Sequence, residues 1–574
     1  MDNNTRPHMN AQTNAEMAAV PRARRAPAPG AQGRRTGIAV LTGLALMAMG
    51  QVSPVIAQIS QTPQTPSLPA AGSAVSPVAP STGLTPPMAP AGSTEQPKRL
   101  WFIQPRVSVT ETFTDNVNPV SGIKLADQIT EVSPGIRLEG DTARLKAYAD
   151  YQVTGYAYAR GSYGNRSQNA LNSFGTLEAL EKRLYLDFSG VISQQSLSAF
   201  APQVASNATP NANRAETSTY RLSPYLRGRL GSEADYEVRY SSTWTDTKSS
   251  LASSLVLQDW SAKVKNSIAK SRFGWTIDAS TQRSAYSNGS KSESDRLRAL
   301  ASYQITPEIK LSVSAGQESN DYIALKRQSK MTSGYGLDWT PTERTLVSAF
   351  SERRMFGDGY NYAISHRTPL MAFKFTDSRD VSFQSNQATA VGRGTVYDLL
   401  FTQLASAFPD PVARAQQVTQ LLAQTGISPS TQVTSSFLTS RVTVLKRQDF
   451  STVLNGVRNT VTVSFNRSVQ DIVGTAAGTG DFAQSTSIAQ RGITGNWAYR
   501  LTPLASLTAT GLLQESSGSG ASTLSSRQKS LNLTYTTRVA AQVNFSLGVR
   551  TSAYASNTIS YRENAMFGTL VAKF

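Results

Sequence analysis

The sequence contains no cysteine and only two histidines, His8 and His366. The absence of cysteine excludes disulfides, thiolate metal ligands and a lipidated N-terminal cysteine. His366 lies beside Ser365, which on a strand points to the opposite face and makes a poor nucleophile partner. Since neither a phosphate-binding glycine loop nor a metal-ligand spacing occurs either, we expect no catalytic, cofactor-binding or metal site, and no enzyme.

Long apolar runs are also missing. The hydrophobic content is 39% and the mean hydropathy is −0.29. After the N-terminal region, no stretch supplies the ~20 apolar residues that a membrane helix needs. Membrane proteins built from strands have such a composition, because half of each strand faces a polar lumen.

Charge of one sign is in excess, with a net charge of +18. Residues 1–57 hold six arginines against two acids, or +4, which leaves +14 for the rest. A basic chain can bind nucleic acid, lie among lipid phosphates or pass anions. Composition alone does not choose between these partners.

The first hundred residues carry export signals and do not belong to the fold. Five arginines precede a short apolar run at 37–49, and Val55-Ile56-Ala57 forms a cleavage site, so residues 1–57 are typical of a secretory signal peptide. Residues 58–100 are rich in Pro, Ala and Ser and cannot bury enough surface to offset the entropy of ordering. We expect a disordered linker there.

From Trp101 onward, polar and apolar residues alternate with a period of two. Residues 144–158 place Leu145 and Val153 on one face, and Lys146 and Asp150 on the other. Residues 308–316, 460–467 and 542–550 repeat this alternation. The period predicts strands with one apolar and one polar face.

The connections between these strands alternate between short and long. The short ones are turn-like, and the long ones, such as 196–216 and 471–484, are polar. Ten short connections with both chain ends on the same side give 2 × (10 + 1), or 22, strands; short turns at one end and longer loops at the other are typical of outer-membrane barrels. We predict an all-β, antiparallel, up-and-down transmembrane barrel over residues 101–574 with about 22 strands, and 18–24 allowed. The ten predicted short connections are 140–143, 181–182, 231–234, 271–272, 306–307, 340–342, 376–378, 455–458, 501–504 and 539–541.

Aromatic residues gather near the ends of the predicted strands, where membrane barrels carry interfacial girdles. These residues are Trp101, Phe102, Trp244, Trp260, Phe273, Trp275, Trp339, Phe373 and Phe375.

The last predicted strand ends on an aromatic residue. Counting back in twos from Phe574 reaches Leu570 and Met566, both apolar. A terminal strand of this kind resembles the signal by which the barrel-assembly machinery recognises outer-membrane proteins. We expect Phe574, Leu570 and Met566 to form that signal.

One segment, 393–435, breaks the strand pattern. Apolar residues recur at helical spacing in 396–408 and 411–424, and Asp410-Pro411 suits a helix start. We predict a helical hairpin in one outer loop, which either caps the barrel or enters the lumen as a plug. Its apolar stripe comprises Leu399, Leu400, Leu404, Leu421 and Leu422.

Four basic residues fall on the polar face of their strands and are candidates for the lumen lining. A lumen with excess cation would favour anions or the carboxylates of an acidic polysaccharide. Alternatively, nearby acids such as Asp150, Asp187, Glu237 and Asp278 pair with these cations in a filled lumen. The four candidates are Lys146, Arg239, Lys310 and Arg550.

Short motifs carry a family resemblance. The stretch 107–116 reads VSVTETFTDN, 132–136 reads VSPGI, 396–400 reads VYDLL and 409–414 reads PDPVAR. Together these resemble the outer-membrane β-barrel family associated with PEP-CTERM protein sorting and exopolysaccharide systems. The resemblance implies a Gram-negative outer-membrane location and a link to surface polysaccharide, but its motifs are structural and assign no residue a catalytic role.

These observations predict a porin-like channel or export component linked to exopolysaccharide or surface-protein biogenesis. A non-conducting scaffold or anchor with a plugged lumen is the first alternative, and an outer-membrane enzyme is a distant third. The expected partners are outer-membrane lipid and lipopolysaccharide, the barrel-assembly machinery and an acidic polysaccharide. We expect no nucleic acid and no cofactor.

Overall fold

The computed structural model describes residues 100–119, 123–266, 272–323, 326–368, 370–383, 414, 418, 437–439, 441–474, 480–520 and 523–574. The predicted signal peptide and nearly all of the predicted linker lie outside these residues, as do the five leucines of the predicted hairpin. Within 393–435 only Arg414 and Val418 are described, both with helical backbone, so the hairpin stays a prediction. Among the described residues, no helix is long and apolar enough to cross a membrane.

The described residues form 22 strands, as the alternation and the turn count predict. The first eleven are β1 Trp101–Thr114, β2 Asp127–Asp141, β3 Leu145–Tyr158, β4 Arg166–Leu180, β5 Leu184–Ser196, β6 Arg214–Leu230, β7 Ala234–Thr247, β8 Leu255–Asn266, β9 Phe273–Tyr286, β10 Lys291–Gln304 and β11 Ile309–Asn320. The others are β12 Gln328–Thr342, β13 Thr345–Arg354, β14 Gly357–Arg367, β15 Met371–Ser382, β16 Thr443–Asn455, β17 Asn459–Ile472, β18 Ser485–Arg500, β19 Ala505–Gly520, β20 Ser525–Ala540, β21 Val543–Ser556 and β22 Ser560–Lys573. A short 3₁₀ helix, η2 (Gly480–Ala483), precedes β18.

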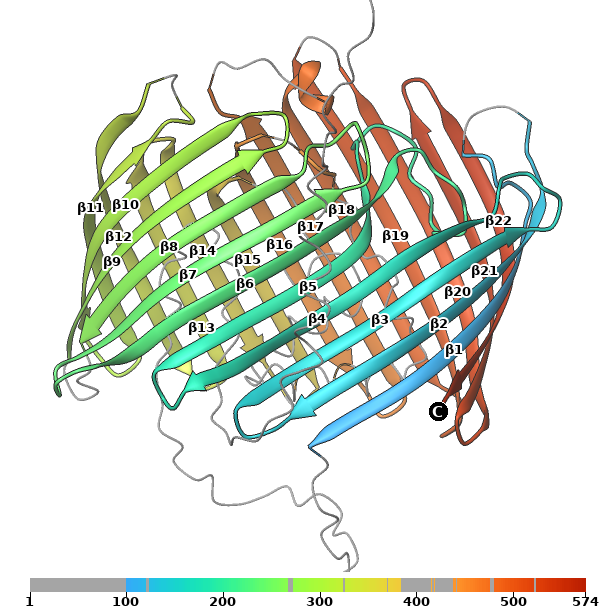
Figure 1. The fold of residues 1–574 in the computed structure, drawn as a ribbon, viewed down its shortest axis with the longest axis horizontal. Coiled ribbons are helices and arrows are strands. Elements are labelled where there is room, and N and C mark those ends of the chain that lie inside the picture. Colours follow the sequence, from blue (N-terminus) through green and yellow to red (C-terminus); the bar gives the residue numbers. More distant parts are fainter. Residues whose placement is uncertain are drawn as a thin grey trace, which may run out of the picture. The chain divides into compact units, whose positions relative to one another are not determined.

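Each strand pairs antiparallel with the next along the chain, and β1 pairs with β22, so the sheet closes on itself (Figure 1). At this seam, Arg106 lies opposite Lys573 and Thr114 lies opposite Ala565. The backbone N–H of Phe574 continues the ladder by donating to the Pro105 carbonyl at 2.9 Å. Closure leaves no strand edge unpaired, which an open sheet of this size could not achieve.

The connections at the two ends of the barrel differ. Nine of the ten predicted short connections fall at or next to the turns that join β2 to β3, β4 to β5 and so on to β20 and β21. The tenth, 376–378, is wrong because it lies inside β15, and the turn before β15 falls between Arg367 and Met371. Two features hide this turn from the sequence: β13 and β14 are short, and only Met355 and Phe356 join them at the opposite end.

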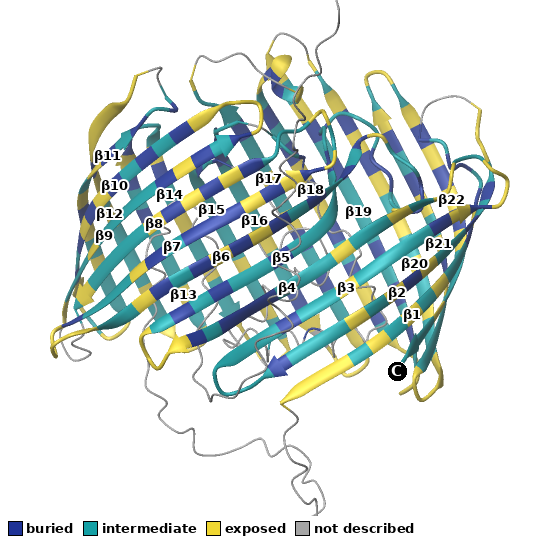
Figure 2. Cartoon of the chain, viewed as in Figure 1, coloured by how far each residue is buried: buried dark blue, intermediate teal, exposed yellow. Residues whose placement is uncertain are grey.

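The wall has two faces, and buried and exposed residues alternate along many of its strands (Figure 2). On β1 the outward side chains include Val107, Val109 and Phe113, all more than a third exposed, while Arg106 and Thr110 point to the lumen. The strand register places every residue of the predicted aromatic girdle on the outer face except Phe102. The outer face is therefore apolar and the inner face polar, the reverse of a soluble protein.

The last strand follows the predicted pattern. Met566 and Leu570 project from the outer face of β22, 49% and 47% exposed, and Phe574 lies just beyond the strand end, 67% exposed. Neither structure nor packing tests recognition by an assembly factor, so the assembly signal remains a prediction.

Candidate functional site: the lumen and its inward loop

The four predicted lumenal cations all point into the barrel, and each has an acidic partner. Lys146 lies 3.6 Å from Asp141 and Lys310 lies 3.7 Å from Asp338. Arg239 and Arg550 are more deeply buried and form closer pairs, described below. The structure therefore supports the alternative in which lumenal cations are paired, rather than a lining of free positive charge.

Arg239 is the centre of a network on β5–β7. Its guanidinium donates to Asp187 at 2.8 Å and to Glu237 at 3.0 Å, and it lies 3.7 Å above the ring of Tyr225. The hydroxyl of Thr176 donates to the same Asp187 carboxylate at 2.8 Å. Packing on an aromatic face and hydrogen bonds to two different carboxylates hold the arginine in one orientation.

A second network crosses β11–β15. Arg354, with 4% of its side chain exposed, donates to Glu318 at 2.9 and 3.0 Å, and also contacts Asp380. The hydroxyl of Tyr322 donates to Glu318 at 3.1 Å. Arg298 forms a similar ion pair, donating two hydrogen bonds to the Asp278 carboxylate at 2.8 and 2.9 Å. These ion pairs join side chains that the sequence separates by 20 residues or more.

The third network lies where β22 meets β1. Glu563 is 1% exposed and accepts from Arg550 and Tyr561 at 2.9 Å, and from Thr114 at 3.1 Å. A fourth donor, the Thr209 hydroxyl at 3.4 Å, comes from a loop and not from the wall. This contact introduces the feature that the sequence analysis missed.

The connection between β5 and β6, residues 197–213, turns into the outer mouth of the barrel; we call it the inward loop (Figure 1). On the far side, the Ser526 hydroxyl of β20 donates to the Ala199 carbonyl at 2.8 Å, and the Tyr554 hydroxyl of β21 donates to the Phe200 carbonyl. Counting through β1 and β22, β20 lies seven strands from β5 around the ring. The loop therefore reaches across part of the lumen.

A second set of contacts fixes the returning half of the inward loop. The Tyr158 hydroxyl of β3 donates to the Ala208 carbonyl at 2.8 Å, and the Arg214 guanidinium donates to the Val204 carbonyl at 2.8 Å. Each of these acceptors is a backbone carbonyl, as on the far side. Pairing these buried groups avoids the cost of leaving a carbonyl without a donor.

Asp481 of η2 holds the first turn of the inward loop. Its carboxylate accepts from the Ser198 hydroxyl and from the backbone N–H of Ala199, both at 2.6 Å. Burial raises the pKa of Asp481 above its usual value, although these two hydrogen bonds act in the opposite direction. The net rise means that the ionised carboxylate is less stable here than in water.

Small apolar clusters complete the docking. Val204 packs with Tyr554 and Tyr561, and Ala208 packs with a cluster that includes Ile129 and Tyr158. A third cluster, under the entry of the loop, comprises Ala199, Phe437, Phe482 and Ile488, with Phe200 and Ile472 against it. Apolar burial at both ends and in the middle makes the inward loop a packed element of the mouth.

The sequence signal for the inward loop was weak. Its length and polar composition were visible, but four of its anchors are backbone carbonyls, which every residue has. The predicted plug, the hairpin with Leu399, Leu400, Leu404, Leu421 and Leu422, lies outside the described residues, so its position stays a prediction. The isolated bridge between Ser196 and Phe437 shows that the chain following residues 393–435 returns beside the inward loop.

His366 lies on the outer face near the short-turn end of β14. Its Nδ1 is 2.8 Å from the Thr345 hydroxyl, and its ring centre is 5.4 Å from that of Phe373. Ser365 points to the lumen, as expected of a strand neighbour. In the described part of the chain, no group of three His, Asp or Glu side chains is arranged to hold a metal ion.

Comparison with known proteins gives structural likeness alone. No family model matches the chain, and no curated protein matches its sequence. Among solved structures, the FrpB iron transporter from Neisseria meningitidis (F5-1 variant) has a TM-score of 0.44 at 10% identity and covers 82% of each chain. The siderophore receptor PirA from Pseudomonas aeruginosa has a TM-score of 0.40 at 10% identity, over 82% of this chain and 80% of its own. Likenesses of this size assign the chain neither a family nor an activity.

Proposed function

We propose that the protein spans the outer membrane of a Gram-negative cell as a gated channel, with the inward loop narrowing its outer mouth. The supporting observation is the combination of a closed sheet, an apolar outer face and a polar inner face crossed by a docked loop. An apolar outer wall is stable only in contact with lipid. A polar inner wall offers a path for hydrated solutes.

The inward loop is the element that we expect to control passage. Four wall strands on two sides of the mouth hold it through Tyr158, Ser526, Tyr554 and Glu563. Each contact is a single hydrogen bond, worth about 0.5–1.5 kcal/mol. Contacts of this size, taken one by one, can be broken without unfolding the sheet.

Selectivity should be modest. Because the predicted lumenal cations are paired with acids, the lumen presents little uncompensated charge where they lie. A preference for anions, such as free cations would produce, is therefore expected to be weak. The link to exopolysaccharide or surface-protein biogenesis rests on the sequence resemblance to the PEP-CTERM-associated barrels, and we retain it as the finer proposal.

Single-channel conductance in a planar bilayer tests the proposal. The intact protein is compared with a double variant, Ser526→Ala with Tyr554→Phe, and with a variant in which a short Gly-Ser linker replaces 198–212. We expect conductance to rise in both variants, more in the second. A deletion of 394–430 serves as the matched comparison, since it tests the predicted hairpin separately from the inward loop.

Two outcomes would contradict the proposal. If the intact protein and every variant show no conductance although heat-dependent gel mobility shows folded barrels, the channel is excluded. The non-conducting scaffold would then be the remaining explanation. Equal conductance in all of them would show that the inward loop does not narrow the path.

A further inference from the structure

A row of basic side chains crosses the outer face near the long-loop end, over β17–β20. In the strand register, Arg467 of β17 lies opposite Arg491 of β18, Arg491 opposite Glu515 of β19, and Glu515 opposite Arg527 of β20. Lys529 lies one outward position closer to the barrel centre on β20. We call Arg467, Arg491, Arg527 and Lys529 the basic rim.

One acid orders this rim without neutralising it. The Glu515 carboxylate accepts from Arg491 at 2.7 Å and forms an ion pair with Arg527 at 2.7 Å, so it holds two guanidiniums side by side. Arg491 stays 70% exposed and Arg527 53% exposed. Arg467 and Lys529 are exposed, and neither forms an ion pair with another residue of the described strands and loops. Four cations against one acid leave a surplus of +3.

The long-loop end of another part of the outer face is nearly neutral. On β9–β11, the outward Arg283 pairs with Glu293 at 3.0 Å, and the loop residue Arg327 pairs with Glu293 and Asp295. Lys291 is the third outward cation there. Three cations against two acids leave +1, so the surplus at the basic rim is a local property of the wall.

The wall changes to apolar immediately below Arg467, Arg491 and Glu515, and in this next row only Lys529 is charged on β17–β20. One outward position down from the row lie Phe465, Ile493 and Leu513, which pair laterally in the same order. Two residues along a strand span about 7 Å. This is the arrangement expected where lipid headgroups meet acyl chains.

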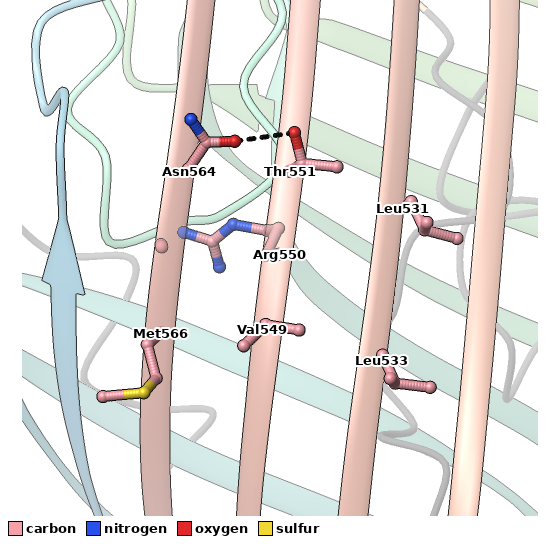
Figure 3. A pocket seen from close by; sticks show the side chains of 8 residues that line it. Leu531, Leu533, Val549, Arg550, Thr551, Asn564 and Met566 are labelled. Carbon is pink, nitrogen blue, oxygen red and sulfur yellow. Dashed lines mark hydrogen bonds between the residues drawn. The ribbon is translucent and has the colours of Figure 1, made fainter.

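Below the cations, the apolar face is hollowed. A shallow groove of about 470 Å³ lies on the outer face of β20–β22. Its outward-pointing lining residues include Leu531, Leu533, Val549 and Met566 (Figure 3). The close-up also shows Thr551 bonded to Asn564 at its upper end, at 2.9 Å. Lys529 is the next outward residue above Leu531. The groove is mostly apolar and open to the outside, so part of an acyl chain can lie in it.

Two glycines deepen the outer face beside the groove, below the basic rim. Gly495 of β18 lies opposite Gly511 of β19, directly below Ile493 and Leu513, and a Cβ at either position would meet nothing within 4 Å. Glycine weakens a strand interior, and no neighbour within the barrel requires it here. A partner that lies against the outer face would account for the missing side chains.

We propose that the outer face of β17–β22 binds a phosphate-bearing lipid of the outer leaflet, with its phosphates on the basic rim and an acyl chain along the groove. Arginine binds phosphate through two parallel N–H groups, and the Arg491–Glu515–Arg527 arrangement orients two such forks. The proposal rests on the proposed function, because it requires the barrel to stand in the outer membrane.

Binding of a defined lipid to the purified protein in detergent tests this site. The probe is a glycolipid with two phosphates, diphosphoryl lipid A, compared with its dephosphorylated form and with inorganic phosphate. We expect Arg467→Gln, Arg491→Gln and Lys529→Gln together to weaken binding of the diphosphorylated probe at least tenfold. The matched control, Arg283→Gln with Lys291→Gln and Arg327→Gln, should bind as the intact protein does.

The comparison arms decide between sources of phosphate. Loss of binding on dephosphorylation, with inorganic phosphate a weak competitor, supports a lipid site. Equal binding of the dephosphorylated form, or equal loss in both triple variants, overturns it. Gly511→Leu should weaken binding of the lipid but leave binding of inorganic phosphate unchanged. An unchanged affinity for the lipid would contradict the role of the two glycines.

The same variants separate this inference from the channel proposal. Heat-dependent gel mobility shows that each variant folds, and single-channel conductance is measured alongside. Unchanged lipid binding with altered conductance refutes the lipid site alone. Intact lipid binding by a silent barrel refutes the channel and leaves the lipid site standing.

Discussion

Arginine behaves differently on the two faces of this barrel wall. Inside, Arg354 is 4% exposed and contacts two carboxylates, Glu318 and Asp380. Outside, Arg491 is 70% exposed although it too has a carboxylate partner, Glu515. The inner arginine is committed to its acids, whereas most of the outer guanidinium remains accessible. Exposure, more than pairing, separates a structural arginine from one that can meet a ligand.

The energetic expectation follows from the same contrast. A buried ion pair contributes little over an apolar replacement, but removing one partner strands a charge and costs several kcal/mol. An exposed pair is screened by water and contributes about 0–1 kcal/mol. The variants below test the comparison from its largest expected effect to its smallest.

Arg354→Met should be the most damaging single change in the lumen. It leaves Glu318, whose side chain is fully buried, without its principal partner. We expect a loss of about 3–5 kcal/mol in unfolding free energy, measured by guanidinium denaturation in detergent. The double variant with Glu318→Gln should recover part of this loss, and no recovery would show that the two residues act independently.

Undocking the inward loop should have an intermediate effect confined to the mouth. Ser526→Ala with Tyr554→Phe removes two hydrogen bonds, at about 1 kcal/mol each. Limited proteolysis should cut within 197–213 faster while the strands stay intact. Thr558→Ala, at the tip of the β21–β22 connection, is a suitable control, because the hydrogen bonds of Thr558 are to Ser556 of the same connection. Unchanged cleavage in the double variant would show that other contacts hold the loop.

A pH change should affect the loop through Asp481. Because burial raises the pKa of this carboxyl in the folded protein, its ionisation opposes docking at neutral pH. As the pH falls through the raised pKa, proton uptake favours the folded form with the loop docked. Proteolysis within 197–213 should therefore become slower. Asp481→Asn should remove this pH dependence, as measured by proteolysis rate against pH. A slope of the opposite sign would contradict the assignment.

The seam should respond to acid in the opposite sense. Burial opposes ionisation of Asp115, but hydrogen bonds from Asn564 and Lys124 outweigh it and lower the pKa. The stability that this carboxylate contributes is present above its usual pKa and is lost as the pH falls through the lowered value. In Asp115→Asn, the protection factors of the amides at the β1–β22 rim should no longer fall as the pH is lowered. A protection that still falls in acid would point to another titrating group.

Glu515→Gln should have the smallest effect on stability. It breaks two exposed ion pairs, so we expect a change within about 1 kcal/mol in unfolding free energy, with a more mobile Arg491. A loss as large as that of Arg354→Met would erase the distinction between the two faces.

The sequence predicted the wall well and its contents poorly. Alternation such as that of Leu145 and Lys146 reports directly which face a residue takes, and turn residues report where strands end. Ion pairs are different, because Glu318 of β11 meets Arg354 of β13 across an intervening strand. Such a pair depends on the register of three strands together, which single-strand patterns do not encode.

The misplaced turn at 376–378 has the same origin. Asp377, Ser378 and Asp380 form a polar cluster typical of a turn, yet they occupy a strand. Ser378 and Asp380 face the lumen, where Asp380 contacts Arg354, and Asp377 faces outward and accepts from Gln448 at 2.9 Å. Near the rim of a barrel, consecutive polar residues can find polar partners on both the inner and the outer face of a strand. A run of polar residues alone therefore does not mark a turn.

The β1–β22 seam gives the barrel a property of rings: its start point is arbitrary. Phe574 donates to Pro105, and both chain ends of the sheet lie at the short-turn end. A linker from Phe574 to Trp101, with a new break at 501–504, would produce a circular permutant with every strand pairing preserved. Such a permutant would separate the contribution of the last strand as a ladder partner from the terminal assembly signal that we predict for it.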